Sequence, residues 1–196
     1  MNDLYTKILD LALPYYEIGR SGDVEHIRWL YEVVLKFLKN TDLDEEIVMP
    51  VLLLHDVGYS QVPKDADPFK LDIRTLHSKK GADIAEEILR KLAYPQDKIR
   101  EVKRLIRKHD NWAFGDSFSE EPVLQFFNNF DFMWMASPKG FSIVRGFMNK
   151  DAQEFYEQIK EFQDINEKEG RDWYTQEIKE YYEELMRQRK KELVDE

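Results

Sequence analysis

A histidine followed at once by an aspartate is the first feature of this sequence that could carry chemistry. His55 and Asp56 come directly after the apolar run 51–54, and Gly58 follows, where the backbone can turn away. An imidazole and a carboxylate at the end of a buried apolar segment are costly unless both are paired or bound to a metal ion. A histidine that ends a helix, followed by a turn at the aspartate, explains the same pattern. The doublet alone is therefore weak evidence for a site.

A second carboxylate, Asp131, lies within a strongly apolar and aromatic stretch. In a helix, Phe127, Phe130 and Trp134 share its face, which predicts that this carboxylate points inward beside the aromatic rings. An unpaired buried aspartate would be protonated, whereas a metal ion would keep it charged. A bond to a backbone amide or to an arginine is the structural alternative.

The chain has only three further histidines, His26, His77 and His109. Taken singly, each is more often an ordinary buried or surface residue than a ligand. His26 lies one turn into a predicted helix, His77 is at the mouth of the next, and His109 ends another. Helical bundles build metal sites from side chains on facing helices, so the four histidines together favour a metal site. Imidazole and carboxylate ligands suit Mn, Fe, Co, Ni or Zn better than Mg or Ca.

The elements that must position these residues are predicted to be helices. Apolar residues recur at helical spacing almost throughout, and no alternating run is long enough to indicate a strand, so the fold class is all-α. Pro50 predicts a kink or a later start in its helix. Five helices are predicted first: one that begins at a capping Asp23, one over 43–56, one that begins at a capping Ser78, one that begins at Pro95 and one over 122–135. The segment 137–140 breaks the last of these, and two charged helices follow, with apolar stripes at Phe155, Ile159 and Phe162 and at Tyr174, Ile178, Tyr181 and Leu185. The clearest loops are 58–70 and 111–121.

The order of these residues resembles the HD superfamily of metal-dependent phosphohydrolases. A lone histidine, a His-Asp doublet and a distant aspartate follow one another here as His26, His55-Asp56 and Asp131. The segments 23–26, 53–58 and 77–85 are also similar to the superfamily, and the resemblance covers residues 20 to 135. It implies an HD-domain helical bundle over residues 1–140, with additional C-terminal helices over 141–196 packed on or beside it.

The resemblance also implies a set of ligands. Members that hold two metals have extra histidines between the doublet and the final aspartate, where His77 and His109 lie here. The expected cofactor is one or two divalent transition metal ions. The superfamily's cyclic-dinucleotide phosphodiesterases typically have a lysine where this chain has Tyr59, which argues against such a substrate. The implied ligands are His26, His55, Asp56 and Asp131 for one ion, with Asp56 bridging to a second ion bound by His77 and His109.

The predicted reaction is hydrolysis of a phosphate ester by a metal-activated water. A metal ion lowers the pKa of bound water from 15.7 towards about 7, and two ions about 3.5–4 Å apart can clamp the phosphoryl oxygens. Asp56 is predicted to orient the nucleophile. Lys79, Lys80 and Arg107 are candidates to contact phosphate, and Lys79 and Arg107 are the candidate catalytic residues among them. Three aromatic residues on the predicted loops are candidates either to stack on a base or to belong to the core: Tyr59, Trp112 and Phe114.

Two other functions fit the same residues. Some proteins of the HD fold hold a di-iron centre and oxygenate a C–H bond, and spacing alone does not separate them from phosphohydrolases. A helical metal-binding or sensory module without turnover is the second alternative. A complete set of candidate ligands argues against a degenerate site.

Composition limits the remaining function classes. The 196 residues include no cysteine, which excludes thiol nucleophiles and disulfides, and the net charge is −10. That charge opposes binding to nucleic acid polymers, so the expected partner is a small phosphorylated substrate, with nucleotides among the candidates. The longest apolar runs are too short to span a membrane, and the first residues lack the pattern of a secretory signal, so we expect a cytoplasmic protein with no membrane partner. The charged segment 187–196 is predicted to be a solvated helical tail, and the oligomeric state is not predicted.

Overall fold

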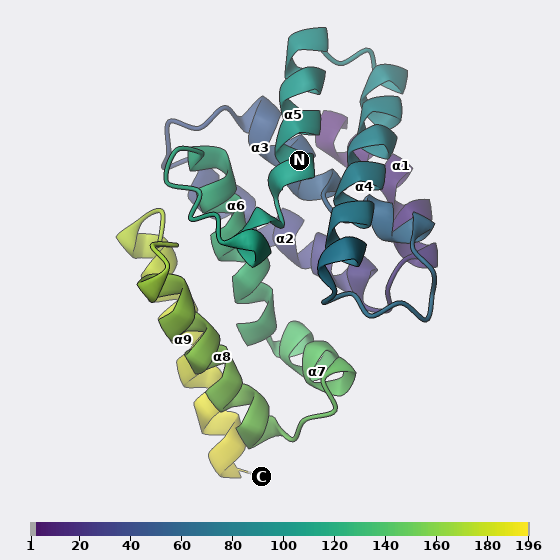
Figure 1. Cartoon of the computed structure of the whole chain (residues 1–196). Coiled ribbons are helices and arrows are strands. Elements are labelled where there is room, and N and C mark those ends of the chain that lie inside the picture. Colours follow the sequence, from purple (N-terminus) through teal and green to yellow (C-terminus); the bar gives the residue numbers. More distant parts are fainter. Residues whose placement is uncertain (1–2, 196) are drawn as a thin grey trace. The chain divides into compact units, whose positions relative to one another are not determined.

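The computed structural model describes residues 3–195, which form nine α-helices and three short 3₁₀ helices without a strand (Figure 1). The all-α prediction is therefore confirmed. Their contacts divide the chain into two compact units, one ending at Asp116 and the other beginning at Ser117. The predicted domain boundary between residues 140 and 141 stays a prediction. Expectations that fall on Met1, Asn2 and Glu196 lie outside the described residues.

The first unit is built around a short helix that is apolar on every side. All residues of this helix from Ile47 to Leu54 are buried, as expected for a helix enclosed by others. It packs against α1, α2 and α5, while α4 lies alongside α5 and also contacts η1 (Figure 1). The elements of this unit are α1 (Asp3–Ile18), α2 (Asp23–Leu38), α3 (Glu45–Leu54), η1 (Val57–Gln61), α4 (Leu71–Lys91), α5 (Gln96–Lys108) and η2 (Asn111–Phe114).

Helix α3 continues through Pro50, so it does not start later as one of the two expectations had it. Proline has no N–H to donate to the carbonyl four residues earlier, which belongs to Glu46. The hydroxyl of Tyr94 donates to that carbonyl oxygen at 2.7 Å. Asp44 caps the helix by accepting from the Glu46 N–H at 2.9 Å.

The predicted capping role of Asp23 and the predicted helix start at Ser78 are wrong. Helix α2 begins at Asp23 after an N-cap at Gly22, and the Asp23 carboxylate accepts from Arg20 instead of capping the helix. Helix α4 begins at Leu71, a full seven residues before Ser78. Its first two turns are largely exposed and therefore lack the apolar periodicity that marks a helix in sequence. Ser78 lies inside α4 and donates to the Arg74 carbonyl at 2.8 Å.

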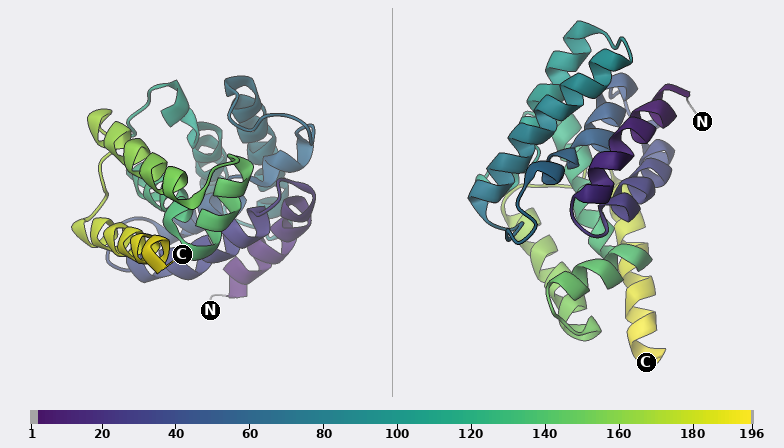
Figure 2. Two further views of the ribbon diagram at one scale, coloured as in Figure 1. Left: turned by 90° about the horizontal axis from the view of Figure 1, so that it is seen from below. Right: turned by 90° about the vertical axis from the view of Figure 1, so that its right-hand side faces the viewer.

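The second unit ends in two long antiparallel helices, α8 and α9. They pack against each other and lie side by side in Figure 2. The predicted break is present at Ser137, where the extended backbone interrupts the preceding helical residues. A helix that is not among those predicted begins directly after it at Pro138, and Ser137 caps this helix by accepting from the Gly140 N–H at 3.1 Å. The predicted tail is helical, and Arg189 within it is buried, so it is not wholly solvated. The elements are α6 (Pro122–Met133), η3 (Trp134–Ala136), α7 (Pro138–Phe147), α8 (Ala152–Lys168) and α9 (Gln176–Asp195). Over the described residues, every helix is either too short or too polar to cross a lipid bilayer.

Candidate metal centre

The end of α3 positions the His-Asp doublet. His55 is the residue that ends the helix, and its Nδ1 lies 2.8 Å from the carbonyl oxygen of Leu52. Because a carbonyl only accepts, Nδ1 carries the proton and Nε2 carries the lone pair in the neutral ring. Asp56 follows with φ −102° and ψ 2°, which turns the chain into η1. The last carbonyls of a helix lack intrahelical donors, so this contact serves the helix and orients the ring.

The end of α5 repeats this arrangement. His109 ends that helix, and its Nδ1 lies 2.6 Å from the carbonyl oxygen of Ile106. Asp110 follows with φ −95° and ψ 6°, nearly the conformation of Asp56, and leads into η2. Two helix ends thus present a histidine and an aspartate with the same local geometry.

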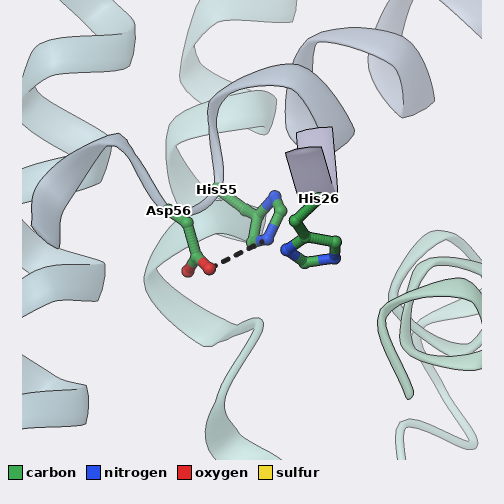
Figure 3. A group of neighbouring side chains, drawn as sticks. All are labelled: His26, His55 and Asp56. Atoms are coloured by element: carbon green, nitrogen blue, oxygen red, sulfur yellow. Dashed lines mark ion pairs between the residues drawn. The ribbon is translucent and has the colours of Figure 1, made fainter. Parts of the chain in front are cut away.

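One group of donor atoms comes from α2 and the end of α3. His26, His55 and Asp56 are buried, and each offers one ligand atom within 4.8 Å of the others. The Nε2 of His55 lies 3.3 Å from Oδ2 of Asp56, and the rings of His26 and His55 have centroids 5.5 Å apart. Figure 3 shows the three side chains gathered together, with His55 between the other two.

A second group joins Asp56 to histidines of α4 and α5. Oδ1 of Asp56 lies 3.4 Å from Nε2 of His77 and 3.5 Å from Nε2 of His109, and the two Nε2 atoms are 3.2 Å apart. The Nδ1 of His77 lies 3.3 Å from the Ile73 carbonyl, so in the neutral rings both Nε2 atoms carry lone pairs. Three acceptor atoms therefore converge on one small volume. Only a positive charge, either a proton or a metal ion, stabilises such a cluster.

Asp56 belongs to both groups and divides its two oxygens between them. Oδ2 faces His55 and Oδ1 faces His77 and His109. A carboxylate placed in this way can bridge two cations. The sequence resemblance implies this role for Asp56, and the geometry is compatible with it.

Arg20 lies beside the site, and the sequence analysis does not predict it. Its guanidinium contacts Oδ2 of Asp56, bonds Oδ1 of Asp23 at 3.0 Å and lies 3.6 Å from the centre of the Tyr59 ring. Tyr59 is itself buried and stacks on His77 with ring centroids 4.0 Å apart, so it belongs to the core. No motif marks Arg20, because it reaches the site from the turn between α1 and α2.

Burial and neighbouring charges shift the pKa values of these residues in different directions. Burial lowers the pKa of His26 well below its usual value and also lowers the pKa of His77. Burial acts in the same direction on His109, but the Asp56 and Asp110 carboxylates outweigh it and raise the pKa. Burial opposes the charge of Asp56, yet His55 and Arg20 hold its pKa well below the usual range. A metal ion requires neutral imidazoles and an ionised carboxylate, and the pKa shifts of His26, His77 and Asp56 favour these forms, whereas the shift of His109 does not.

The donor set fits a divalent transition metal. It combines the imidazole nitrogens of four histidines with one shared carboxylate. In three of these histidines, a backbone carbonyl contacts Nδ1 and orients the ring. Such hydrogen bonds on the far ring nitrogen are the usual support of metal-binding histidines. Imidazole-rich sets suit Zn, Fe, Ni and related ions better than Mg or Ca.

The remaining predictions about site residues have different outcomes. His77 lies two turns inside α4, so the expectation that it marks a helix mouth is wrong. Asp131 is a half-buried residue of α6 in the second unit, and its role as a ligand stays a prediction. Lys79 and Arg107 are exposed and line a pocket on the first unit, as does Phe114.

These features define a class: an all-helical protein with a buried histidine and aspartate cluster suited to divalent metal ions. The model of the HD domain family matches residues 23–192, so the chain belongs to the HD superfamily of metal-dependent phosphohydrolases. The match extends beyond the range in which the sequence resemblance was recognised and includes most of the C-terminal helices. No curated protein and no solved structure matches the chain.

Proposed function

We propose that this protein hydrolyses a phosphate ester with water, using one or two divalent transition metal ions. The observation that supports this most directly is the division of the Asp56 carboxylate between two donor groups. His26, His55 and Asp56 would hold one ion, and Asp56, His77 and His109 would hold a second. Asp131 is proposed as a further ligand of the first ion on the strength of the family pattern.

The bound ions would supply Lewis acidity and lower the pKa of water from 15.7 to about 7. The chain's own residues have separate tasks. Asp56 would orient the attacking water through whichever oxygen faces it, and Arg20 holds that carboxylate in place. The backbone contacts of His55 and His109 keep their Nε2 atoms directed into the cluster.

The proposed substrate is a small phosphorylated molecule, with nucleotides among the candidates. The net charge of −10 opposes long polyanions such as nucleic acids, whereas a small anion can be attracted by local positive charge. Lys79 and Arg107 are the proposed contacts to a phosphate group of this substrate. We also propose a cytoplasmic location, with no membrane partner.

Removal of metal should abolish hydrolysis. We expect the protein treated with a chelator and then desalted to lose activity on p-nitrophenyl phosphate and on a panel of nucleotides, and added Mn, Co or Ni to restore it. Metal content and phosphate release, measured on the same samples, check this. Undiminished activity in the metal-free protein would refute the proposal, and oxygen consumption by an iron-loaded sample without phosphate release would favour the oxygenase alternative.

His109→Ala should remove mainly the second ion. His109 contributes to one donor group only, whereas Asp56 contributes to both. We therefore expect metal content to fall by about one ion per chain and kcat to fall by about 100-fold, as for loss of one transition-state interaction. His26→Ala is the matched variant for the first group. If both variants lose the same ion, the two groups do not form separate sites.

A further inference from the structure

A pocket of about 320 Å³ lies on the first unit beside the donor cluster but is lined by other residues. One wall comes from α4 and the opposite wall from the end of α5 and η2. Its volume is in the range of small-molecule sites. The pocket therefore has room for a part of a ligand that lies outside the cluster itself.

An ion pair of the pocket lining also contacts the cluster. Arg74 and Asp110 both line the pocket, and Nη1 of Arg74 lies 2.9 Å from Oδ2 of Asp110. The same oxygen of Asp110 is 3.6 Å from Nε2 of His77. The Asp110 carboxylate thus contacts Arg74 of the pocket and His77 of the cluster. The pocket and the cluster are therefore close enough for one small ligand to reach into both.

The lining of the pocket is strongly basic, in contrast to the net charge of −10 for the whole chain. Three cations, Arg74, Lys79 and Arg107, line it together with a single acid, Asp110. Such a local reversal of sign in an acidic protein attracts small anions.

Arg74 is a fixed charge, whereas the other two cations are adjustable. The side chain of Arg74 is only 12% exposed, and its guanidinium lies 4.6 Å from the centre of the Trp112 ring as well as beside Asp110. Arg107 pairs with Asp83 at 3.2 Å, but both side chains are about half exposed, so the pair is weak and its guanidinium can turn to a ligand. Lys79 is exposed at the rim.

The lining of the pocket also includes one apolar side chain. Phe114 lines it and is 53% exposed, so its ring is accessible to a ligand. The pocket thus offers cations for an anionic group and a ring against which the organic part of a ligand can pack.

We propose that this pocket binds a second anionic, phosphate-like group of the substrate, while the group to be cleaved lies at the donor cluster. The proposal rests on the proposed hydrolase function and names its substrate class: small molecules with two anionic groups. A free phosphate ion has the same chemistry, and the experiment below separates the two sources.

The first measurement is binding of inorganic phosphate to the full chain by isothermal titration calorimetry, with a chelator present so that metal-bound phosphate does not contribute. We expect Lys79→Gln/Arg107→Gln to raise the Kd by about tenfold or more, because two charge-assisted contacts are lost. Lys80→Gln/Arg100→Gln removes two exposed charges of the same elements that do not line the pocket, and should change the Kd by less than about twofold. No binding by the native chain, or equal weakening in both double variants, overturns the proposal.

The second measurement compares adenosine monophosphate with adenosine bisphosphate as inhibitors of p-nitrophenyl phosphate hydrolysis. We expect the bisphosphate to bind about tenfold more tightly to the native protein, and this advantage to disappear in Lys79→Gln/Arg107→Gln but not in the control. If only inorganic phosphate depends on these residues, the ligand is a free anion and the substrate assignment is wrong. Failure of hydrolysis itself would refute the proposed function and would leave the calorimetric result to decide on the pocket.

Discussion

Asp56→Asn should lower kcat/KM by about 1,000-fold or more and reduce metal content to one ion or none. The reason is that each oxygen of Asp56 faces a different donor group, so this substitution weakens both groups at once. Asparagine keeps the shape but has no charge, and its amide N–H₂ would face an imidazole lone pair or a cation. Metal analysis and steady-state kinetics on the same preparation measure the two effects.

The matched control for this variant is Asp42→Asn, which removes an exposed carboxylate of the same unit. We expect the control to keep both its metal and its activity. Asp56→Asn leaves Arg20 without one of its two carboxylate partners, so the variant must also be shown to be folded by circular dichroism. A folded Asp56→Asn protein with the activity of the native protein would show that the cluster is not the catalytic centre.

The residue types of the cluster could be recognised in the sequence because they are rare and ordered. Four histidines in 196 residues can be considered one by one, and the structure brings all four together with Asp56. The pattern of apolar residues also predicted the helices that carry His26, His55 and His109, because these helices are amphipathic or fully buried. Their roles as ligands remain predictions.

The features that the sequence analysis missed depend on long side chains or on exposed helix turns. Arg20 and Arg74 reach carboxylates 36 residues away in each case, at Asp56 and Asp110, and no local pattern indicates such contacts. The start of α4 at Leu71 was missed because exposed turns carry no apolar periodicity. As a result, His77 was placed at a helix end, although it lies inside a helix that passes the cluster.

Gly58→Ala should lower the free energy of unfolding by about 3 kcal/mol or more and remove the second ion. A Cβ at this position would lie 1.9 Å from the carbonyl oxygen of His77 and 2.5 Å from the backbone nitrogen of Gly81. Both are backbone atoms of α4, so they cannot turn aside as a flexible side chain would. The glycine after the doublet is therefore what allows η1 to pack directly on α4, next to His77. Chemical denaturation and metal analysis measure the two effects.

The matched control is Gly146→Ala, because a Cβ added to Gly146 in α7 would have no heavy atom within 4 Å. Alanine favours a helix over glycine by about 0.5–1 kcal/mol, so the control should be neutral or slightly more stable. The two variants add the same methyl group, and any difference between them reports the close approach of η1 to α4. If Gly58→Ala unfolds at the denaturant concentration of the native protein and keeps its metal, these two elements do not pack as described. In that case His77 would also lose its place beside Asp56, because η1 follows Asp56 directly along the chain.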